Sequence, residues 1–129
     1  MLSDFPAMPV LAVTDLDRAR RYYEDTLGLS PGDELTEGVV YRAGGVDMLV
    51  YPSSYAGTNK ATAVSFMVPE SAFDDEVARL RERGVAFQEF EMEGATWRDG
   101  VAEMDDMRAV WFEDPDGNIL NLQAMPGAG

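Results

Sequence analysis

The chain has 129 residues, 46% of them hydrophobic, and a formal net charge of −14 at pH 7, which predicts a single domain, residues 1–129, with a sizeable core. Such a negative surface repels a phosphate backbone, and no apolar run approaches the roughly 18 residues that span a bilayer, so we expect a cytoplasmic protein that binds neither nucleic acid nor membrane. The absence of cysteine and histidine removes disulfides, thiolate and imidazole metal ligands, and the usual general base at neutral pH.

The first half of the chain predicts a strand, a capped helix and three further strands. Thr14 and Asp17 form a capping-box pattern at the start of the helix, and Gly28 ends it. Gly44-Gly45 reads as a two-residue turn between the last two strands. The strands are expected at residues 8–13, 30–35, 39–42 and 47–51.

The same order restarts after a linker, at about 53–60, that is rich in serine, glycine and proline. Ser71 and Asp74 repeat the capping-box pattern, and Gly84 ends the second helix. Strands are expected at residues 63–68, 85–90, 108–113 and 119–123, with an irregular polar loop at 91–105. The repetition predicts a duplicated strand-helix-three-strand module, with copies at about 8–52 and 61–124.

A hairpin closed by Asp114-Pro115-Asp116-Gly117 ends the second module. A type I turn followed by a bulge sets Trp111 opposite Asn121 and Phe112 opposite Leu120. Because side chains alternate along a strand, Trp111 and Asn121 share one face of the sheet, and Phe112 and Leu120 share the other.

The order of these motifs resembles the vicinal oxygen chelate superfamily, which includes glyoxalase I, extradiol dioxygenases and the bleomycin-resistance proteins. The motifs are Val13-Thr14-Asp15-Leu16, Tyr22-Tyr23, Leu27-Gly28-Leu29 and Asp114-Pro115-Asp116-Gly117-Asn118. The resemblance implies an α+β fold in which two tandem βαβββ modules form curled mixed sheets around a cup, with the helices on the outer face. It also implies that modules combine either within one chain or across a homodimer.

In the metalloenzymes of that superfamily, four residues from the first and fourth strands hold a divalent metal at the cup floor. The corresponding positions here are Met8, Leu49, Ala63 and Asn121. None supplies the imidazole or carboxylate that such ions require, so the resemblance implies a protein without metal or other cofactor and without metal-dependent glyoxalase or dioxygenase chemistry. A solvated acidic face explains the carboxylates that remain for a hard cation, Asp47, Glu113, Glu103, Asp105 and Asp106.

Strand alternation places an apolar and aromatic set with a few polar groups on the cup face, as is typical of a small-molecule pocket. With two side chains of the 91–105 loop, the candidate ligand-binding residues are Met8, Leu49, Tyr51, Ala63, Ser65, Met67, Trp97, Met104, Trp111, Glu113, Asn121 and Gln123. The alternate residues of these strands point to the other face of each sheet and are expected in the helix-covered core. They are Leu11, Val13, Val50, Phe66, Phe112 and Leu122. Trp97 belongs either to a lid over the cup or to an anchor that holds its loop on the sheet.

Three functions stay open at this point. The first, which the replaced metal positions favour, is a metal-independent protein that sequesters a partly aromatic small molecule, and the charge of −14 favours a cationic one. The second is a metal-free lyase or isomerase with Glu113 as general base, its pKa raised by burial. The third is a dimeric scaffold whose cup is filled by its own side chains.

Overall fold

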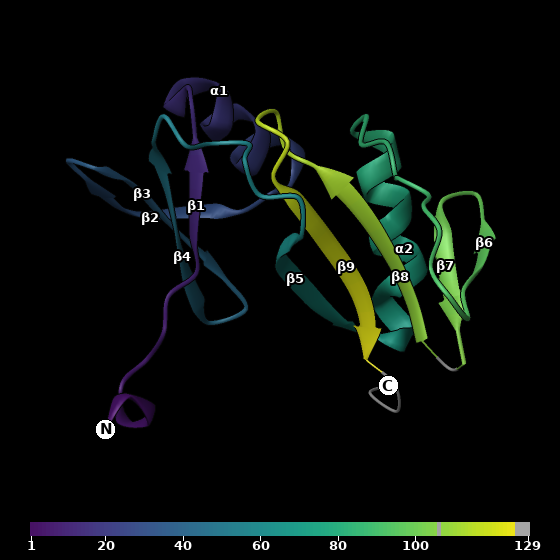
Figure 1. Ribbon diagram of the computed structural model, residues 1–129. Coiled ribbons are helices and arrows are strands. Elements are labelled where there is room, and N and C mark those ends of the chain that lie inside the picture. Colours follow the sequence, from purple (N-terminus) through teal and green to yellow (C-terminus); the bar gives the residue numbers. More distant parts are fainter. Residues whose placement is uncertain (106, 126–129) are drawn as a thin grey trace. The chain divides into compact units, whose positions relative to one another are not determined.

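The computed structural model describes residues 1–105 and 107–125. The chain forms two compact units: unit 1 is Met1–Asn59 with Pro115–Asn118, and unit 2 is Lys60–Asp114 with the chain from Ile119 onward. Each unit holds one mixed sheet and one main helical segment (Figure 1). Unit 1 follows the predicted strand-helix-three-strand order, and unit 2 has one strand more. The predicted α+β fold of two βαβββ modules is therefore confirmed. No helix in the described part of the chain is long and apolar enough to cross a membrane.

Unit 1 contains a four-stranded sheet in the order β1-β4-β3-β2, in which β1 and β4 run parallel and the other neighbours antiparallel. Its strands are β1 (Val10–Val13), β2 (Ser30–Leu35), β3 (Gly38–Ala43) and β4 (Val46–Pro52). Its helical segments are the 3-10 turn η1 (Leu2–Asp4), the short helix α1 (Leu16–Arg20) and the π-helical segment η2 (Arg21–Thr26). Gly44 and Gly45 both have positive φ, at 58° and 84°, as a two-residue hairpin turn of the primed type requires.

The core of unit 1 lies between its helical segment and one face of its sheet. Ala19 and Tyr23 are fully buried, four positions apart on the apolar stripe of the helical segment, and the sheet contributes Leu11, Val13 and Val50. These buried strand residues are the alternate positions that were predicted to face the helix. The other face of the sheet carries the exposed side chains, such as that of Val10.

A polar cluster secures η2 on β3. The hydroxyl of Tyr41 donates a hydrogen bond of 2.8 Å to Glu24, which also accepts one of 2.8 Å from Arg20. The hydrogen bond from Arg20 holds the pKa of Glu24 below its ordinary value, against the effect of burial. Burial raises the pKa of Tyr41, and the neighbouring Glu24 carboxylate raises it further. The folded state therefore favours ionised Glu24 beside neutral Tyr41.

We expect Glu24→Gln to reduce the acid sensitivity of the protein. A carboxyl whose pKa is lower in the folded state adds stability above its unfolded value of 4.5, and this contribution is lost as the pH falls through the folded pKa. Because Arg20 and Glu24 are partly exposed, ionised Glu24 contributes about 1 kcal/mol to the free energy of unfolding. Urea unfolding at a series of pH values should show a shallower decline below 4.5 for the variant. Parallel curves for the two proteins would contradict the assignment.

Unit 2 contains a five-stranded sheet in the order β5-β9-β8-β7-β6, again with its first pair parallel. Its strands are β5 (Thr62–Pro69), β6 (Thr96–Arg98), β7 (Val101–Met104), β8 (Met107–Glu113) and β9 (Ile119–Met125). Its helix, α2 (Glu70–Glu82), contacts β5 and β9. Phe73 and Val77 from the helix and Phe112 and Leu120 from the sheet are buried between these layers. The predicted hairpin register is confirmed, with Trp111 opposite Asn121 and Phe112 opposite Leu120.

The strand predicted at residues 85–90 is not formed, and the loop predicted at 91–105 contains β6 and β7. The segment makes one backbone hydrogen bond to β8, from the Gln88 N–H to the Trp111 carbonyl at 2.9 Å, and forms no strand. Its side chains pack instead: Phe87 meets Phe112 edge to face at 6.2 Å between ring centroids. Asp99 and Gly100 have positive φ, at 49° and 81°, and turn β6 into β7. Asp-Gly is a strong signal for a two-residue hairpin turn, so this sequence feature was available and missed.

Both predicted capping boxes are wrong. Asp15, not Thr14, is the N-cap of α1, and its side chain accepts a hydrogen bond of 3.1 Å from the Arg18 backbone N–H. Helix α2 starts one residue before Ser71, after Pro69, and has no side-chain cap. The hydroxyl of Thr14 has a different partner, described next.

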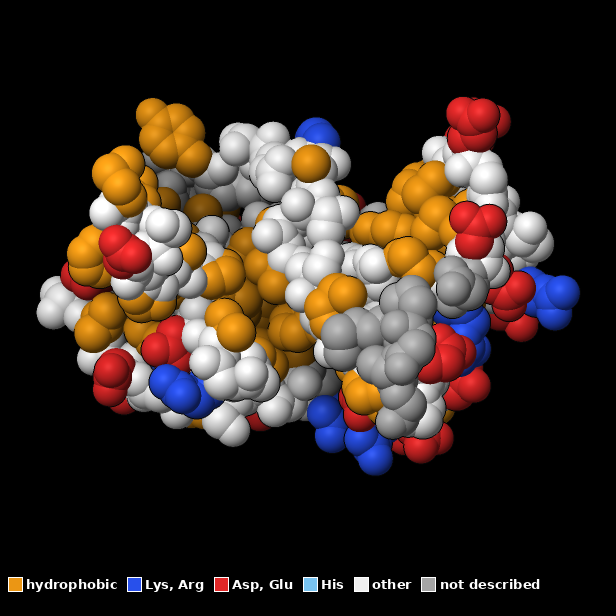
Figure 2. All heavy atoms as spheres, turned by 90° about the horizontal axis from the view of Figure 1, so that it is seen from below, with side chains coloured by type: hydrophobic (Ala, Val, Ile, Leu, Met, Phe, Trp, Pro, Cys, Tyr) orange, Lys and Arg blue, Asp and Glu red, His pale blue; other side chains and the backbone are white. Residues whose placement is uncertain are grey.

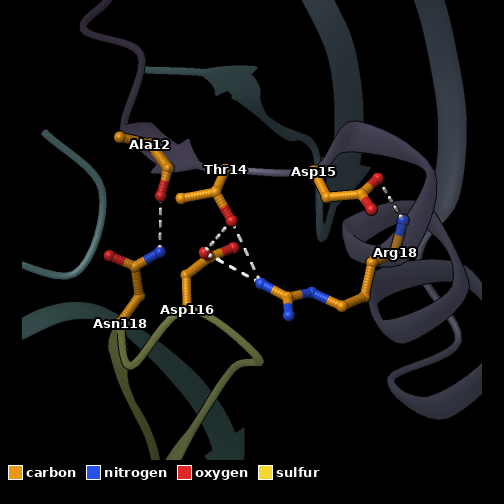
Figure 3. A network of polar contacts seen from close by, with 6 residues as sticks. All are labelled: Ala12, Thr14, Asp15, Arg18, Asp116 and Asn118. Carbon is orange, nitrogen blue, oxygen red and sulfur yellow. Dashed lines mark hydrogen bonds and ion pairs between the residues drawn. The ribbon is translucent and has the colours of Figure 1, made fainter. Parts of the chain in front are cut away.

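The turn that closes the hairpin, residues 115–118, belongs to unit 1 and is held there by polar contacts (Figure 3). The Thr14 hydroxyl donates to Asp116 Oδ1 at 2.6 Å, and Arg18 Nη2 pairs with the same oxygen at 3.0 Å. The amide of Asn118 donates to the carbonyl of Ala12 at 2.8 Å. The side chain of Asp116 is only 4% exposed, so these contacts compensate the burial of its charge.

We expect Asp116→Ala to lower the free energy of unfolding by about 1–3 kcal/mol, because it removes the buried carboxylate that accepts hydrogen bonds from Thr14 and Arg18. Urea unfolding followed by circular dichroism measures the change. Asp33→Ala is the matched control, since Asp33 is an exposed aspartate of β2. Equal effects of the two substitutions would show that the network in Figure 3 contributes nothing specific to stability.

Candidate functional site

The four positions that correspond to metal ligands in the superfamily fall at matching points along the two modules. Leu49 in β4 lies opposite Val10 of β1, and Asn121 in β9 lies opposite Ser65 of β5. Met8 precedes β1, which begins two residues later than predicted and leaves Met8 43% exposed. Ala63 lies in β5 where the register with β9 shifts. The duplication therefore extends to the register of the strands that would carry a metal site.

These four side chains do not fit a divalent metal. They offer a thioether, two hydrocarbon groups and one neutral amide, where hard or borderline ions require imidazole or anionic oxygen. Among residues 1–105 and 107–125, no group of three or more histidine, cysteine, aspartate or glutamate side chains is placed to hold a metal ion. Asp106, one of the carboxylates considered for a hard cation, lies outside the described residues.

On unit 2, Asn121 is the central polar group of the candidate face. It is 1% exposed, and its Nδ2 donates to the carbonyl of Val110 at 3.1 Å. Its Oδ1 is buried with no hydrogen-bond partner. An unsatisfied buried acceptor costs about 1–3 kcal/mol, so a bound donor would gain from meeting it. Ser65 and Trp111 lie opposite Asn121 on the neighbouring strands.

Three aromatic rings contact one another next to Ser65 and Asn121. We call Phe90, Trp97 and Trp111 the aromatic cluster. The ring centroids are 5.3 Å apart for Phe90 and Trp97, 5.1 Å for Phe90 and Trp111, and 6.1 Å for the two tryptophans. Trp111 Nε1 also donates to Thr62 Oγ1 at 3.1 Å. The structure thus brings together two predicted site residues and adds Phe90, which the sequence analysis had placed in a strand. Trp97 packs its hairpin against the sheet, which favours its interpretation as an anchor of the loop over its interpretation as a lid.

The other candidates on unit 2 lie around this centre. Met67 and Gln123 face each other across β5 and β9, and Gln123 Nε2 contacts Met107 Sδ at 3.6 Å. Met104 ends β7, two positions beyond the Ala102 that faces Trp97. Glu113 is exposed at the end of β8. The burial expected of Glu113 in a role as general base is therefore absent.

The remaining candidates, Met8, Leu49 and Tyr51, belong to unit 1. Leu49 and Tyr51 are half-buried on the sheet face away from the helix, where Tyr51 lies opposite Ala12. A small open hollow of about 340 Å³ is lined by Thr14, Pro52, Ser53 and Ser54. It contains none of the predicted site residues, so the aromatic cluster of unit 2 is the stronger candidate.

Comparison with known proteins supplies the family context. The model of the Glyoxalase/Bleomycin resistance protein/Dioxygenase superfamily matches residues 6–122. A glyoxalase/bleomycin resistance protein/dioxygenase from Alicyclobacillus acidocaldarius has a similar structure, with a TM-score of 0.71, 14% identity and coverage of 95% of this chain and 92% of that one. The fosfomycin resistance protein FosX from Listeria monocytogenes matches with a TM-score of 0.70, 16% identity and coverage of 95% and 94%.

A third similar structure is lactoylglutathione lyase from Agrobacterium tumefaciens, with a TM-score of 0.67, 18% identity and coverage of 96% of this chain and 98% of that one. No curated protein sequence matches the chain. At these identities the structural neighbours establish the fold, and the activities in their names are not transferred by the likeness.

Proposed function

The chain belongs to the glyoxalase/bleomycin resistance protein/dioxygenase superfamily, and on that premise we propose that it is a cytoplasmic, metal-independent protein that sequesters a partly aromatic, cationic small molecule. The observation that carries the proposal is the aromatic cluster, which presents Phe90, 43% exposed, beside two half-buried tryptophans. Aromatic rings with a few convergent polar groups are the lining expected of a small-molecule site.

The residues at the four corresponding positions support metal independence. Met8, Leu49, Ala63 and Asn121 cannot replace imidazole or carboxylate ligands. Asn121 instead offers a buried amide oxygen that can accept a hydrogen bond from an N–H or O–H group of an organic ligand. The net charge of −14 attracts cationic compounds and repels anionic ones.

We also propose that the binding form is a homodimer. Val10, on the open face of the unit 1 sheet, is 51% exposed, and Met8, two residues before β1, is 43% exposed. Exposed apolar side chains near one another are typical of surfaces that bind another protein. Sedimentation equilibrium over a range of protein concentrations measures the assembly. A monomer at every concentration would contradict the dimer and leave the binding proposal intact.

A thermal-shift screen tests the proposed function. One panel contains aromatic and cationic organic compounds, and the other contains divalent metals with and without chelator. A ligand present at about 100 times its dissociation constant adds roughly 2.7 kcal/mol of stability, enough to raise the unfolding midpoint by several degrees. We expect shifts in the organic panel and none in the metal panel. A chelator-reversible metal shift without any organic response would overturn the proposal.

A further inference from the structure

A hollow of about 400 Å³ opens on unit 2 beside the aromatic cluster. It is lined by Glu89, Phe90, Glu91, Met92, Ala95 and Trp97. Five of them precede β6 and Trp97 lies in it; β6 is the strand that gives unit 2 five strands where unit 1 has four. The size falls in the range of roughly 300–1,000 Å³ typical of small-molecule sites. The hollow is therefore a feature of the second module and is not explained by the duplication.

The two aromatic rings that line the hollow, those of Phe90 and Trp97, are held by contacts with the sheet. Phe90 and Trp97 contact each other edge to face and both pack against Trp111 of β8. Trp111 is itself tied to Thr62 of β5 by its indole N–H. A ring held in this way loses little conformational freedom when a ligand arrives. The negative faces of aromatic rings attract organic cations, and the attraction grows as the cation leaves water.

The charge of the lining is also suited to a cation. Two of the six lining residues are glutamates, and none is lysine or arginine. Glu89 is held in place because its Oε2 accepts a hydrogen bond of 2.8 Å from the backbone N–H of Gly100. In Figure 2 the right-hand side of the molecule, which unit 2 forms, carries hydrophobic surface next to acidic side chains. An anion would be repelled here, and a neutral apolar group would leave the acidic charge uncompensated.

We propose that this hollow binds the ammonium group, quaternary or protonated, of the compound that the protein sequesters. The inference rests on the proposed function and names the part of the ligand that this side of the site recognises. A bare metal ion is a poor occupant, because no group of three or more metal-binding side chains is present among the described residues. An alkylated ammonium has a lower cost of dehydration and matches both the rings and the glutamates.

Tryptophan fluorescence tests the proposal directly, because the chain has two tryptophans and both belong to the aromatic cluster. The probes are choline and dimethylbutanol, its uncharged isostere, in which carbon replaces nitrogen. We expect choline to change the fluorescence at a concentration about tenfold lower than dimethylbutanol does, since only the cation gains from the ring faces and the glutamates. Equal responses to both probes would overturn the proposal.

Substitutions of the lining residues test whether choline binds in this hollow. We expect Glu91→Gln to weaken choline binding about fivefold and Phe90→Leu to weaken it by a similar factor. Glu93→Gln is the matched control, because Glu93 is exposed on the same segment and does not line the hollow. Equal losses for Glu91→Gln and Glu93→Gln would overturn the site. If choline fails to bind while a compound from the thermal-shift screen still does, the ammonium site is wrong and the proposed function stands; if no organic compound binds, both fail.

Discussion

Phe112→Ala is expected to lower the free energy of unfolding by about 3–5 kcal/mol, the cost of truncating a large aromatic side chain in a packed core. Phe112 is 2% exposed on the face of β8 that is covered within unit 2. It lies opposite the fully buried Leu120 and contacts Phe87, so its removal leaves a cavity beside these side chains. Urea unfolding followed by far-UV circular dichroism measures the loss.

Two further variants of β8 make this result interpretable. Phe112→Leu keeps most of the volume, so we expect it to cost less than about 1.5 kcal/mol. Glu113→Gln, at the exposed neighbouring position, should change stability by less than about 0.5 kcal/mol. If Phe112→Ala costs less than about 1 kcal/mol, the assignment of this face of β8 to the core is wrong.

Trp111→Ala, one position away on the opposite face, is expected to weaken binding of the aromatic cationic compound by at least about tenfold. The substitution removes the ring that packs on both Phe90 and Trp97, and each aromatic pair contributes about 0.5–1.5 kcal/mol. It also removes the hydrogen bond to Thr62. The expected loss of stability, about 1–3 kcal/mol, is smaller than that for Phe112→Ala because Trp111 is only half-buried.

Isothermal titration calorimetry with the best compound from the thermal-shift screen measures this change in affinity. Trp111→Phe retains a ring and should recover part of the lost binding. The comparison with Phe112→Ala separates the two faces of one strand, because that variant should bind the compound normally under conditions where it is folded. Unchanged affinity in Trp111→Ala would place the ligand away from the aromatic cluster.

The two faces of β8 were predictable because local rules decide them. The turn at residues 114–117 determines the register of its hairpin, and strand alternation then assigns Trp111 and Phe112 to opposite faces. The helical stripe of Ala19 and Tyr23 was predictable for the same reason, since residues four apart share a helix face.

The aromatic cluster was only half predictable. Trp97 and Trp111 were both candidates, but their contact depends on the β6–β7 hairpin, whose Asp99-Gly100 turn was not recognised in a polar stretch. Phe90 was assigned to a strand because apolar residues alternate around it, whereas that segment makes a single backbone hydrogen bond to β8, from Gln88, and packs its side chains without forming a strand. Competition between packing and hydrogen-bonded pairing is decided by tertiary context, which one sequence does not reveal.

The capping errors have a similar cause. Thr14 has the residue type of an N-cap, but its hydroxyl is engaged by Asp116, more than a hundred positions later in the chain. Asp15 then caps α1 in its place. A local motif predicts only partners that are near in the sequence. Here the Asp116 carboxylate is the stronger hydrogen-bond partner for the Thr14 hydroxyl.

The most direct test of metal-independent binding is a calorimetric titration of the wild-type protein with the best compound from the thermal-shift screen, performed in excess chelator and then with manganese, nickel or zinc added. The replacement of all four corresponding ligand positions predicts the same dissociation constant in each condition, within the error of the measurement. Binding that disappears in chelator and returns with a metal would contradict the account, because it would require a metal site that these residues cannot form.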